Sequence, residues 1–225
     1  MKRIVLALAI SVVCGGSLSA QASPEAEALL SKMRETVGGA GRLAAARTLE
    51  FRGTLIPAPG QEPAPITVRV ARPNLYWMRI QLPAGEILNL FDGEKAWYRT
   101  VLPGDPGVWE PMEPAEGIEL RTRAWETANP DGIMDLPGRT VSVDAEGRLV
   151  MTYTEGEPRK RVLTDGLPQV EESSDGATRL EAYQEFEGIR FPTKMTTRGP
   201  LGDVITQFNE VLINPEFAPE QFVAK

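Results

Sequence analysis

The sequence contains no histidine and one cysteine, Cys14, among its 225 residues. Histidine is the usual general base near neutral pH and a common zinc ligand, and cysteine supplies nucleophiles, disulfides and thiolate ligands. Catalytic triads and cysteine–histidine sites are therefore excluded. Carboxylate chemistry stays open, but the sequence has no Asp-rich calcium loop, Gly-rich phosphate loop or nucleophile elbow. We expect no cofactor, no metal, no catalytic residues and a protein that is not an enzyme.

Long apolar runs are confined to the N-terminus. The basic start Met1-Lys2-Arg3 is followed by mostly apolar residues over 4–13 and by small residues at Ala20 and Ala22. This pattern predicts a signal peptide over residues 1–22, which is too short to span a bilayer as a helix. Cleavage after Ala22 leaves 225 − 22 = 203 residues, exported to the periplasm and soluble. The alternative, a lipid anchor on Cys14, is disfavoured because the preceding Val13 is not small.

Positive charge is also scarce. The chain has 31 acidic and 24 basic residues, a net charge of −7, and loss of Lys2 and Arg3 takes it to −9. A field of this sign repels nucleic acid, which we exclude as a partner. No Ser/Gly-rich or charged linker divides the chain, so we expect one domain over 23–225, and a monomer.

The spacing of apolar residues predicts two helices. Ser23-Pro24 supplies a capping hydroxyl and a first-turn proline, and Gly38-Gly39 ends this helix. A short helical turn over 42–46 follows. Pro114 begins the second helix, which runs to residue 128 and ends before an Asn-Pro pair. Gly117 costs this second helix about 1 kcal/mol relative to alanine, so we predict a marginal helix that could move.

The rest of the chain has the pattern of short strands joined by tight turns. Apolar and polar residues alternate between Asp-Gly, Glu-Gly and Pro-Asn turns, most regularly after residue 139. The predicted strands are 49–55, 66–72, 75–82, 86–92, 95–101, 148–154, 159–164, 169–172, 177–186, 190–197 and 203–213. An open antiparallel sheet of about 11 strands should curl. Its concave apolar side would be covered by the two helices.

Arg72 breaks the alternation. It continues the parity of Ile66, Val68 and Val70, so its side chain should point to the apolar face of the sheet. A guanidinium there must find partners. A structural ion pair with a nearby glutamate is one way to supply them.

The residues around Arg72 carry a family resemblance. Arg72-Pro73-Asn74-Leu75, the pair Tyr76-Trp77 and the segment Asp-Gly-Glu-Lys-Ala-Trp-Tyr over 92–98 resemble the LolA/LolB-like family of outer-membrane lipoprotein-sorting carriers, in its broader, uncharacterised branch. Segments 187–195 and 209–222 resemble the later strands and the closing segment of the same group. The resemblance covers most of 24–225, and is specific in the 66–98 block.

This resemblance implies an α+β fold, mainly antiparallel β, in which one curled sheet forms an incomplete, half-open barrel covered by helices. It implies a carrier that holds an acyl chain, a lipoprotein or another apolar ligand between sheet and lid, with Arg72 as a latch on the lid backbone. An envelope membrane protein could be donor or acceptor. The expected ligand-binding residues are Arg72, Val68, Val70, Met78, Ile80, Phe91 and Trp125. Apart from Arg72, they would be ordinary core unless the helices leave space.

Two other functions stay open. Related half-barrels act as envelope-stress sensors or interaction modules, although we expect no second domain of the kind that such a role would use. A carboxylate-type enzyme would need a pair of inward-facing acids in the hollow, and the fold does not imply chemistry. The cargo itself cannot be identified from the sequence.

Overall fold

The computed structural model describes residues 21–58, 61–129, 138–156, 158–173, 176–199 and 202–224. Cys14 and the expected leader, apart from its last two residues, lie outside the described residues. So do four residues that the sequence assigned to turns or to the end of the second helix: Pro59, Gly60, Pro130 and Asp175.

The described strands form one sheet with the order β1-β8-β9-β10-β11-β12-β13-β14-β2-β3-β4-β5-β6-β7. Neighbouring strands are antiparallel, except for the parallel pair β1 and β8. The strands are β1 (Gln21–Ala22), β2 (Thr48–Ile56), β3 (Ala64–Ala71), β4 (Leu75–Leu82), β5 (Gly85–Phe91), β6 (Ala96–Val101), β7 (Glu110–Pro111), β8 (Thr140–Val143), β9 (Leu149–Thr152), β10 (Arg159–Thr164), β11 (Leu167–Ser173), β12 (Gly176–Phe186), β13 (Ile189–Gly199) and β14 (Gly202–Ile213).

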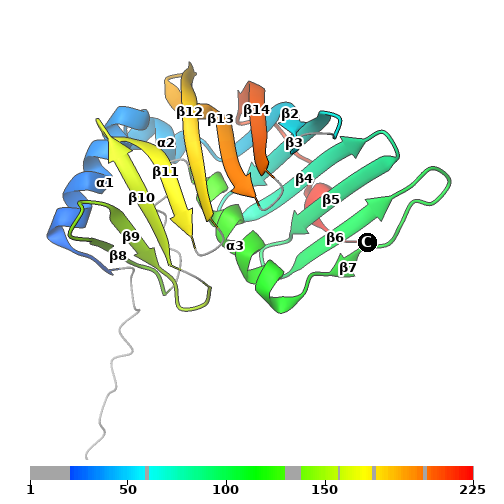
Figure 1. Cartoon of the computed structure of the whole chain (residues 1–225), viewed down its shortest axis with the longest axis horizontal. Coiled ribbons are helices and arrows are strands. Elements are labelled where there is room, and N and C mark those ends of the chain that lie inside the picture. Colours follow the sequence, from blue (N-terminus) through cyan, green and yellow to red (C-terminus); the bar gives the residue numbers. More distant parts are fainter. Residues whose placement is uncertain are drawn as a thin grey trace, which may run out of the picture.

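The sheet curls without closing, because β1 and β7 remain as its two edges (Figure 1). This confirms the half-open antiparallel barrel expected from the sequence. The expected number of strands was too low, since the described residues contain 14 rather than 11. Of the three missed strands, β1 lies within the expected leader, and β7 and β8 have only two and four residues.

Three α-helices and one 3₁₀-helix are present among the described residues: α1 (Pro24–Val37), α2 (Ala40–Ala45), α3 (Pro114–Ala128) and η1 (Pro219–Phe222). The Ser23 hydroxyl caps α1 by accepting a hydrogen bond from the Ala26 N–H, and Gly38 ends it. By contrast, α3 has no side-chain N-cap and no basic residue in its last turn. Its end groups are therefore satisfied by other parts of the fold or by solvent.

Both long helices pack into a single hydrophobic core. Leu30 and Met33 of α1 and Leu120 and Ala124 of α3 belong to one buried cluster with the inward side chains of the sheet. Helix α1 contacts β8, β11 and β13, whereas α3 contacts β3 to β6. The two helices therefore cover different halves of the curled sheet, and α3 runs between its two arms in Figure 1.

The seam between β14 and β2 depends on a glycine. The register shifts between Phe208 and Glu210, opposite Gly53, and an ideal Cβ on Gly53 would overlap the carbonyl oxygen of Gln207. We expect Gly53→Ala to lower the free energy of unfolding by about 2 kcal/mol because the backbone must shift. The melting temperature should fall by about 4–8 °C, as calorimetry would measure.

The matched control is Gly41→Ala in α2, where an added Cβ meets no atom within 4 Å. This change should leave the stability unchanged or raise it by up to about 1 kcal/mol, since alanine is the better helix former. Equal effects of the two substitutions would contradict the tight approach of β14 to β2.

Candidate ligand-binding site

The structure brings the expected apolar lining residues together on one face of the sheet. Val68 and Val70 of β3, Met78 of β4 and Phe91 of β5 are buried in the core cluster. Ile80 and Trp125 are partly buried and pack against the same cluster. Register explains the grouping, because the pairs Val68–Met78, Val70–Tyr76 and Tyr76–Phe91 place side chains on the same, concave face. This face forms an apolar wall beneath α3.

The apolar wall is covered in this structure. Leu120, Ala124 and Ala128 of α3 are buried against it. Two hollows on the described surface lie elsewhere: one of about 470 Å³ beside Arg42 and Arg190, and one of about 320 Å³ beside Tyr98 and Val108. Neither is lined by the residues of the apolar wall. A ligand that reaches this wall would therefore have to displace α3.

Arg72 lies where the parity of β3 placed it, one residue beyond the end of the strand. Its Nε donates to the carbonyl oxygen of Ala128 at 3.2 Å, and an Nη donates to the carbonyl oxygen of Leu43 at 2.7 Å. These carbonyls belong to the last turns of α3 and α2. A guanidinium at this position satisfies carbonyls that have no partner within their helices and complements the negative end of each helix dipole. The half-buried Arg72 thus fastens two helices to the sheet.

Asn129 adds a second fastening at the same end of α3. This residue is 1% exposed, and its Nδ2 donates to the carbonyl oxygens of Trp125 at 2.6 Å and Pro73 at 3.2 Å. At the other end, the Met112 N–H donates to the Ala96 carbonyl oxygen at 3.0 Å, just before the helix begins. The N-terminal end of α3 is therefore held to β6 by a backbone hydrogen bond, and its C-terminal end is held by polar side chains.

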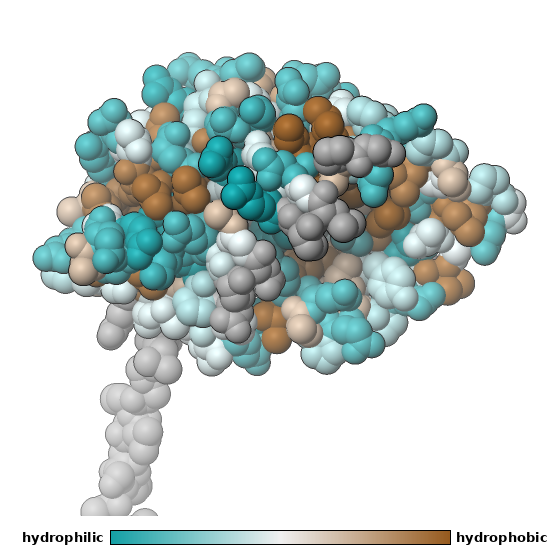
Figure 2. All heavy atoms as spheres, in the orientation of Figure 1, coloured by the Kyte–Doolittle hydropathy of each residue, from teal (hydrophilic) through white to brown (hydrophobic). Residues whose placement is uncertain are grey.

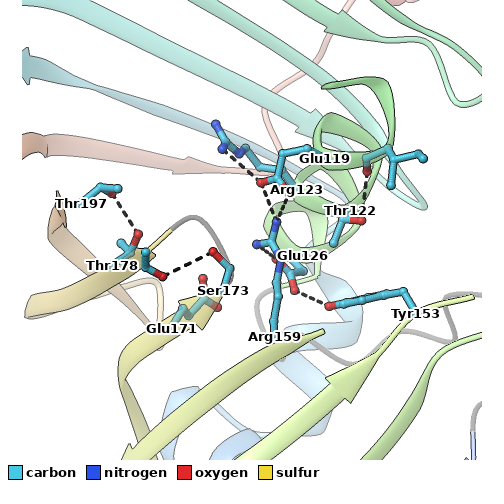
Figure 3. Close-up of polar contacts among 12 residues, drawn as sticks. Glu119, Thr122, Arg123, Glu126, Tyr153, Arg159, Glu171, Ser173, Thr178 and Thr197 are labelled. Carbon is cyan, nitrogen blue, oxygen red and sulfur yellow. Dashed lines mark hydrogen bonds and ion pairs between the residues drawn. The ribbon is translucent and has the colours of Figure 1, made fainter. Parts of the chain in front are cut away.

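A cluster of charged residues, which we call the ionic cluster, lies between α3 and the strands β10 and β11 (Figure 3). Arg159 of β10 contacts both oxygens of Glu119 at 2.6 and 2.7 Å and one oxygen of Glu126 at 2.9 Å. The Tyr153 hydroxyl donates to the other oxygen of Glu126 at 2.7 Å. Arg161 pairs with Glu171 of β11 and lies 3.9 Å from Glu126. These contacts attach the polar side of α3 to the half of the sheet opposite the apolar wall.

Burial sets the protonation behaviour of the ionic cluster. It raises the pKa of the Glu126 carboxyl, as does the neighbouring Glu171 carboxylate, and the opposing arginines do not restore the usual value. Burial also acts to raise the pKa values of the Glu119 and Glu171 carboxyls. The positive charge of Arg159 beside Glu119, and of Arg161 beside Glu171, outweighs burial, so both pKa values are lowered. Burial, and then Glu126, raise the pKa of the Tyr153 hydroxyl. Among these three carboxyls, the ionised form is therefore least favoured at Glu126.

Sequence reasoning missed the ionic cluster, although two signals were present. Arg159 and Arg161 lie on one face of a predicted strand, like Arg72 and the residues of its parity. Lys160 between them makes the run typical of a solvent-exposed strand. Glu119 and Glu126 are seven residues apart and therefore lie on one face of their helix. Neither signal indicates that the two faces meet, because strand and helix are far apart in the sequence.

The tryptophans of the family-like block are on the opposite, convex face. Trp77 pairs with Leu90, which pairs with Trp97, while their neighbours of the other parity face the core. The Arg69 guanidinium lies 4.9 Å from the Trp77 ring centroid and 5.7 Å from that of Phe217, near the C-terminal end of the chain. Both tryptophans thus belong to the packing of the outer surface and do not line the hollow.

Comparison with known proteins identifies the fold. No family model and no curated protein match the sequence. Solved structures do match. The fold is LolA-like. A LolA superfamily protein of Nitrosomonas europaea has 12% sequence identity to this chain and a TM-score of 0.56, and the match covers 88% of this chain and 97% of that one.

Two further structures agree. A DUF1329 family protein of Desulfovibrio piger has 10% identity and a TM-score of 0.59, covering 89% of this chain and 98% of its own. An outer membrane lipoprotein-sorting protein domain of Vibrio parahaemolyticus has 10% identity and a TM-score of 0.52, covering 81% and 94%. Identities of 10–12% show a shared fold alone. The family resemblance found around Arg72 agrees with these structures at the level of the fold.

In the ranges that the structure describes, no group of three or more Asp, Glu, His or Cys side chains is arranged to hold a metal ion. In the same ranges, no helix is both long enough and apolar enough to cross a bilayer.

Proposed function

We propose that this protein is a periplasmic carrier that binds an acyl chain, a lipoprotein or another apolar ligand in place of α3. The observation that carries the proposal is the arrangement of α3, which covers a concave apolar wall and is held at its C-terminal end by Arg72 and Asn129. The LolA-like fold supports it, since one structure with this fold is described as a lipoprotein-sorting domain. The proposed role is non-catalytic, and an envelope membrane protein would be the donor or acceptor.

Helix α3 is better suited to leave the sheet than α1. Its buried side chains are small, apart from Leu120, whereas α1 buries Leu30, Met33 and Val37. Burial of a leucine contributes about 2 kcal/mol, and each buried methylene of an acyl chain contributes about 0.8 kcal/mol. Ten buried methylenes would therefore contribute about 8 kcal/mol, enough to compete with the apolar contacts of α3.

The proposed location in the periplasm depends on the signal peptide predicted over residues 1–22. Cleavage after Ala22 would remove β1, which pairs with β8, and α1 would then be the first element of a monomeric mature chain over 23–225. Purification of the protein from a periplasm, followed by N-terminal sequencing and extraction of bound lipid for mass spectrometry, would test export and identify the cargo.

The Arg72→Leu variant tests the latch. It removes two hydrogen bonds from a charged donor, to Ala128 of α3 and to Leu43 of α2. The bond to Ala128, worth about 1.5 kcal/mol, stabilises the closed position of α3. Since closure competes with ligand, we expect the variant to retain bound lipid more strongly, by about tenfold in apparent affinity, without unfolding. Native mass spectrometry of purified variant and parent would measure the retention.

Arg42→Leu is the matched control, because Arg42 also donates to a backbone carbonyl, that of Gly38, but on the surface beside α1. It should leave retention unchanged. Retention that is equal in the parent and in Arg72→Leu would remove the latch assignment. A stoichiometric protein partner in place of lipid would favour the sensor or interaction-module function instead.

A further inference from the structure

The strand side of the ionic cluster has the features of a recognition site. Arg159 and Arg161 project from β10 on the same face as their register partners Met151 and Leu149, which belong to the hydrophobic core. The two guanidinium side chains are only 12% and 8% exposed. The Nε atom of Arg161 is buried and has no hydrogen-bond partner among the described residues. Two cations, one with a spare donor, therefore lie beside an apolar surface.

Helix α3 supplies much of the negative charge that these cations need. It contributes two carboxylates and one guanidinium, Glu119, Glu126 and Arg123, a net charge of −1 (Figure 3). The strand side contributes Arg159, Arg161 and Glu171, a net charge of +1. If α3 leaves, Arg159 loses both of its carboxylate partners, and a desolvated guanidinium without a counterion is costly. An anion that took their place would remove this cost.

We propose that the preferred ligand is an anionic amphiphile whose phosphate or carboxylate head group binds Arg159 and Arg161, in the positions that the Glu119 and Glu126 carboxylates occupy in the closed structure. This inference rests on the function proposed above and specifies the class of its ligand. The planar guanidinium fork of arginine matches both kinds of head group. The Tyr153 hydroxyl, which now donates to Glu126, is a third donor to the head group.

The two halves of the hollow fit the two parts of such a ligand. The charged residues lie on β10 and β11, while the apolar wall is formed by β3, β4 and β5 across the curled sheet. Helix α3 lies between them and presents carboxylates to one half and Leu120 and Ala124 to the other. An amphiphile with its head at Arg159 and its chain along the apolar wall would reproduce both sets of contacts.

The test compares probes with the same chain and different head groups. Dissociation constants of the purified protein would be measured by native mass spectrometry for hexadecyl phosphate, neutral monopalmitoylglycerol and cationic hexadecyltrimethylammonium, with inorganic phosphate as a chainless competitor. The ratio between two probes in one protein is informative because the cost of displacing α3 cancels. We expect hexadecyl phosphate to bind at least tenfold more tightly than the neutral probe, and the cationic probe to bind most weakly.

The Glu119→Gln/Arg159→Gln double variant removes one cation of the proposed site together with the α3 carboxylate that contacts it through both oxygens, while Glu126 keeps the Tyr153 hydroxyl and Arg161 as partners. Its preference for hexadecyl phosphate over the neutral probe should fall to less than threefold. Arg198→Gln, an exposed arginine that pairs with Asp203 on β13 and β14, is the control for loss of positive charge and should keep the parental ratio.

Four results would overturn the inference. Equal binding of the anionic and neutral probes by the parent would do so and would leave the proposed carrier function intact. Persistence of the anionic preference in the double variant would place the head group elsewhere. Displacement of hexadecyl phosphate by an equal concentration of inorganic phosphate would indicate a site for free anions. Absence of binding by every probe would contradict the carrier function itself, and the inference with it.

Discussion

Replacement of Ala124 by aspartate is expected to release α3 from the sheet. Ala124 of α3 is completely buried, in the core cluster that contains the residues of the apolar wall. A carboxylate there would lose its hydration without gaining a partner, at a cost of several kcal/mol. Undocking α3 avoids this cost, because the helix then carries the carboxylate into water.

The release should appear as faster amide hydrogen exchange over 114–128, by at least 100-fold, while the strands keep their protection. Apparent affinity for hexadecyl phosphate should rise at least tenfold, because the competing helix no longer occupies the site. Unchanged ligand affinity in a variant whose α3 has been released would show that the apolar wall does not bind the ligand.

Ala115→Asp is the matched control. It makes the same substitution on the same helix, at an exposed position in the first turn. A negative charge there is compatible with the helix dipole and contributes no more than about 1 kcal/mol. Exchange rates and affinity should therefore remain within about threefold of those of the parent.

Loss of the Glu126 carboxylate is expected to lower the stability of the protein markedly. Glu126→Ala removes a partner of Arg159, of Arg161 and of the Tyr153 hydroxyl in a region where the side chains are only 8–12% exposed. Breaking a buried ionic group by removing one partner costs about 3–5 kcal/mol. Urea denaturation should show a decrease of about 3 kcal/mol in the free energy of unfolding.

Glu155→Ala provides the comparison for this variant. Glu155 also pairs with a residue of α3, Arg121 at 2.8 Å, but its side chain is 58% exposed. Such a surface pair contributes about 0.5 kcal/mol. If the two variants lost the same stability, the ionic cluster would not be buried as described.

Local sequence patterns were enough to predict most of the fold. Alternation predicted 11 of the strands, and the residues Ser23 and Gly38 marked the ends of α1 because capping chemistry acts over a few residues. The same local parity placed Arg72 on the concave face, where its guanidinium reaches helix carbonyls. In each case, the information was carried by neighbouring residues.

The parts that could not be predicted depend on contacts between distant segments. The pairing of Glu126 with Arg159 joins residues 33 positions apart, on a helix and a strand whose relative placement follows from the curl of the whole sheet. Whether the hollow stays open depends on the volumes of side chains from several elements, including the small residues Ala124 and Ala128 that let α3 approach. Alternation shows which way a side chain points, but not which distant residue it meets.

The most direct test of the account follows the position of α3 during binding. Amide hydrogen exchange of the parent protein would be measured with and without saturating hexadecyl phosphate. We expect residues 118–128 to exchange faster with the ligand, while β3 and β4 remain protected, since the ligand takes the place of the helix. Bound ligand together with unchanged or slower exchange in α3 would contradict the proposal that α3 is displaced.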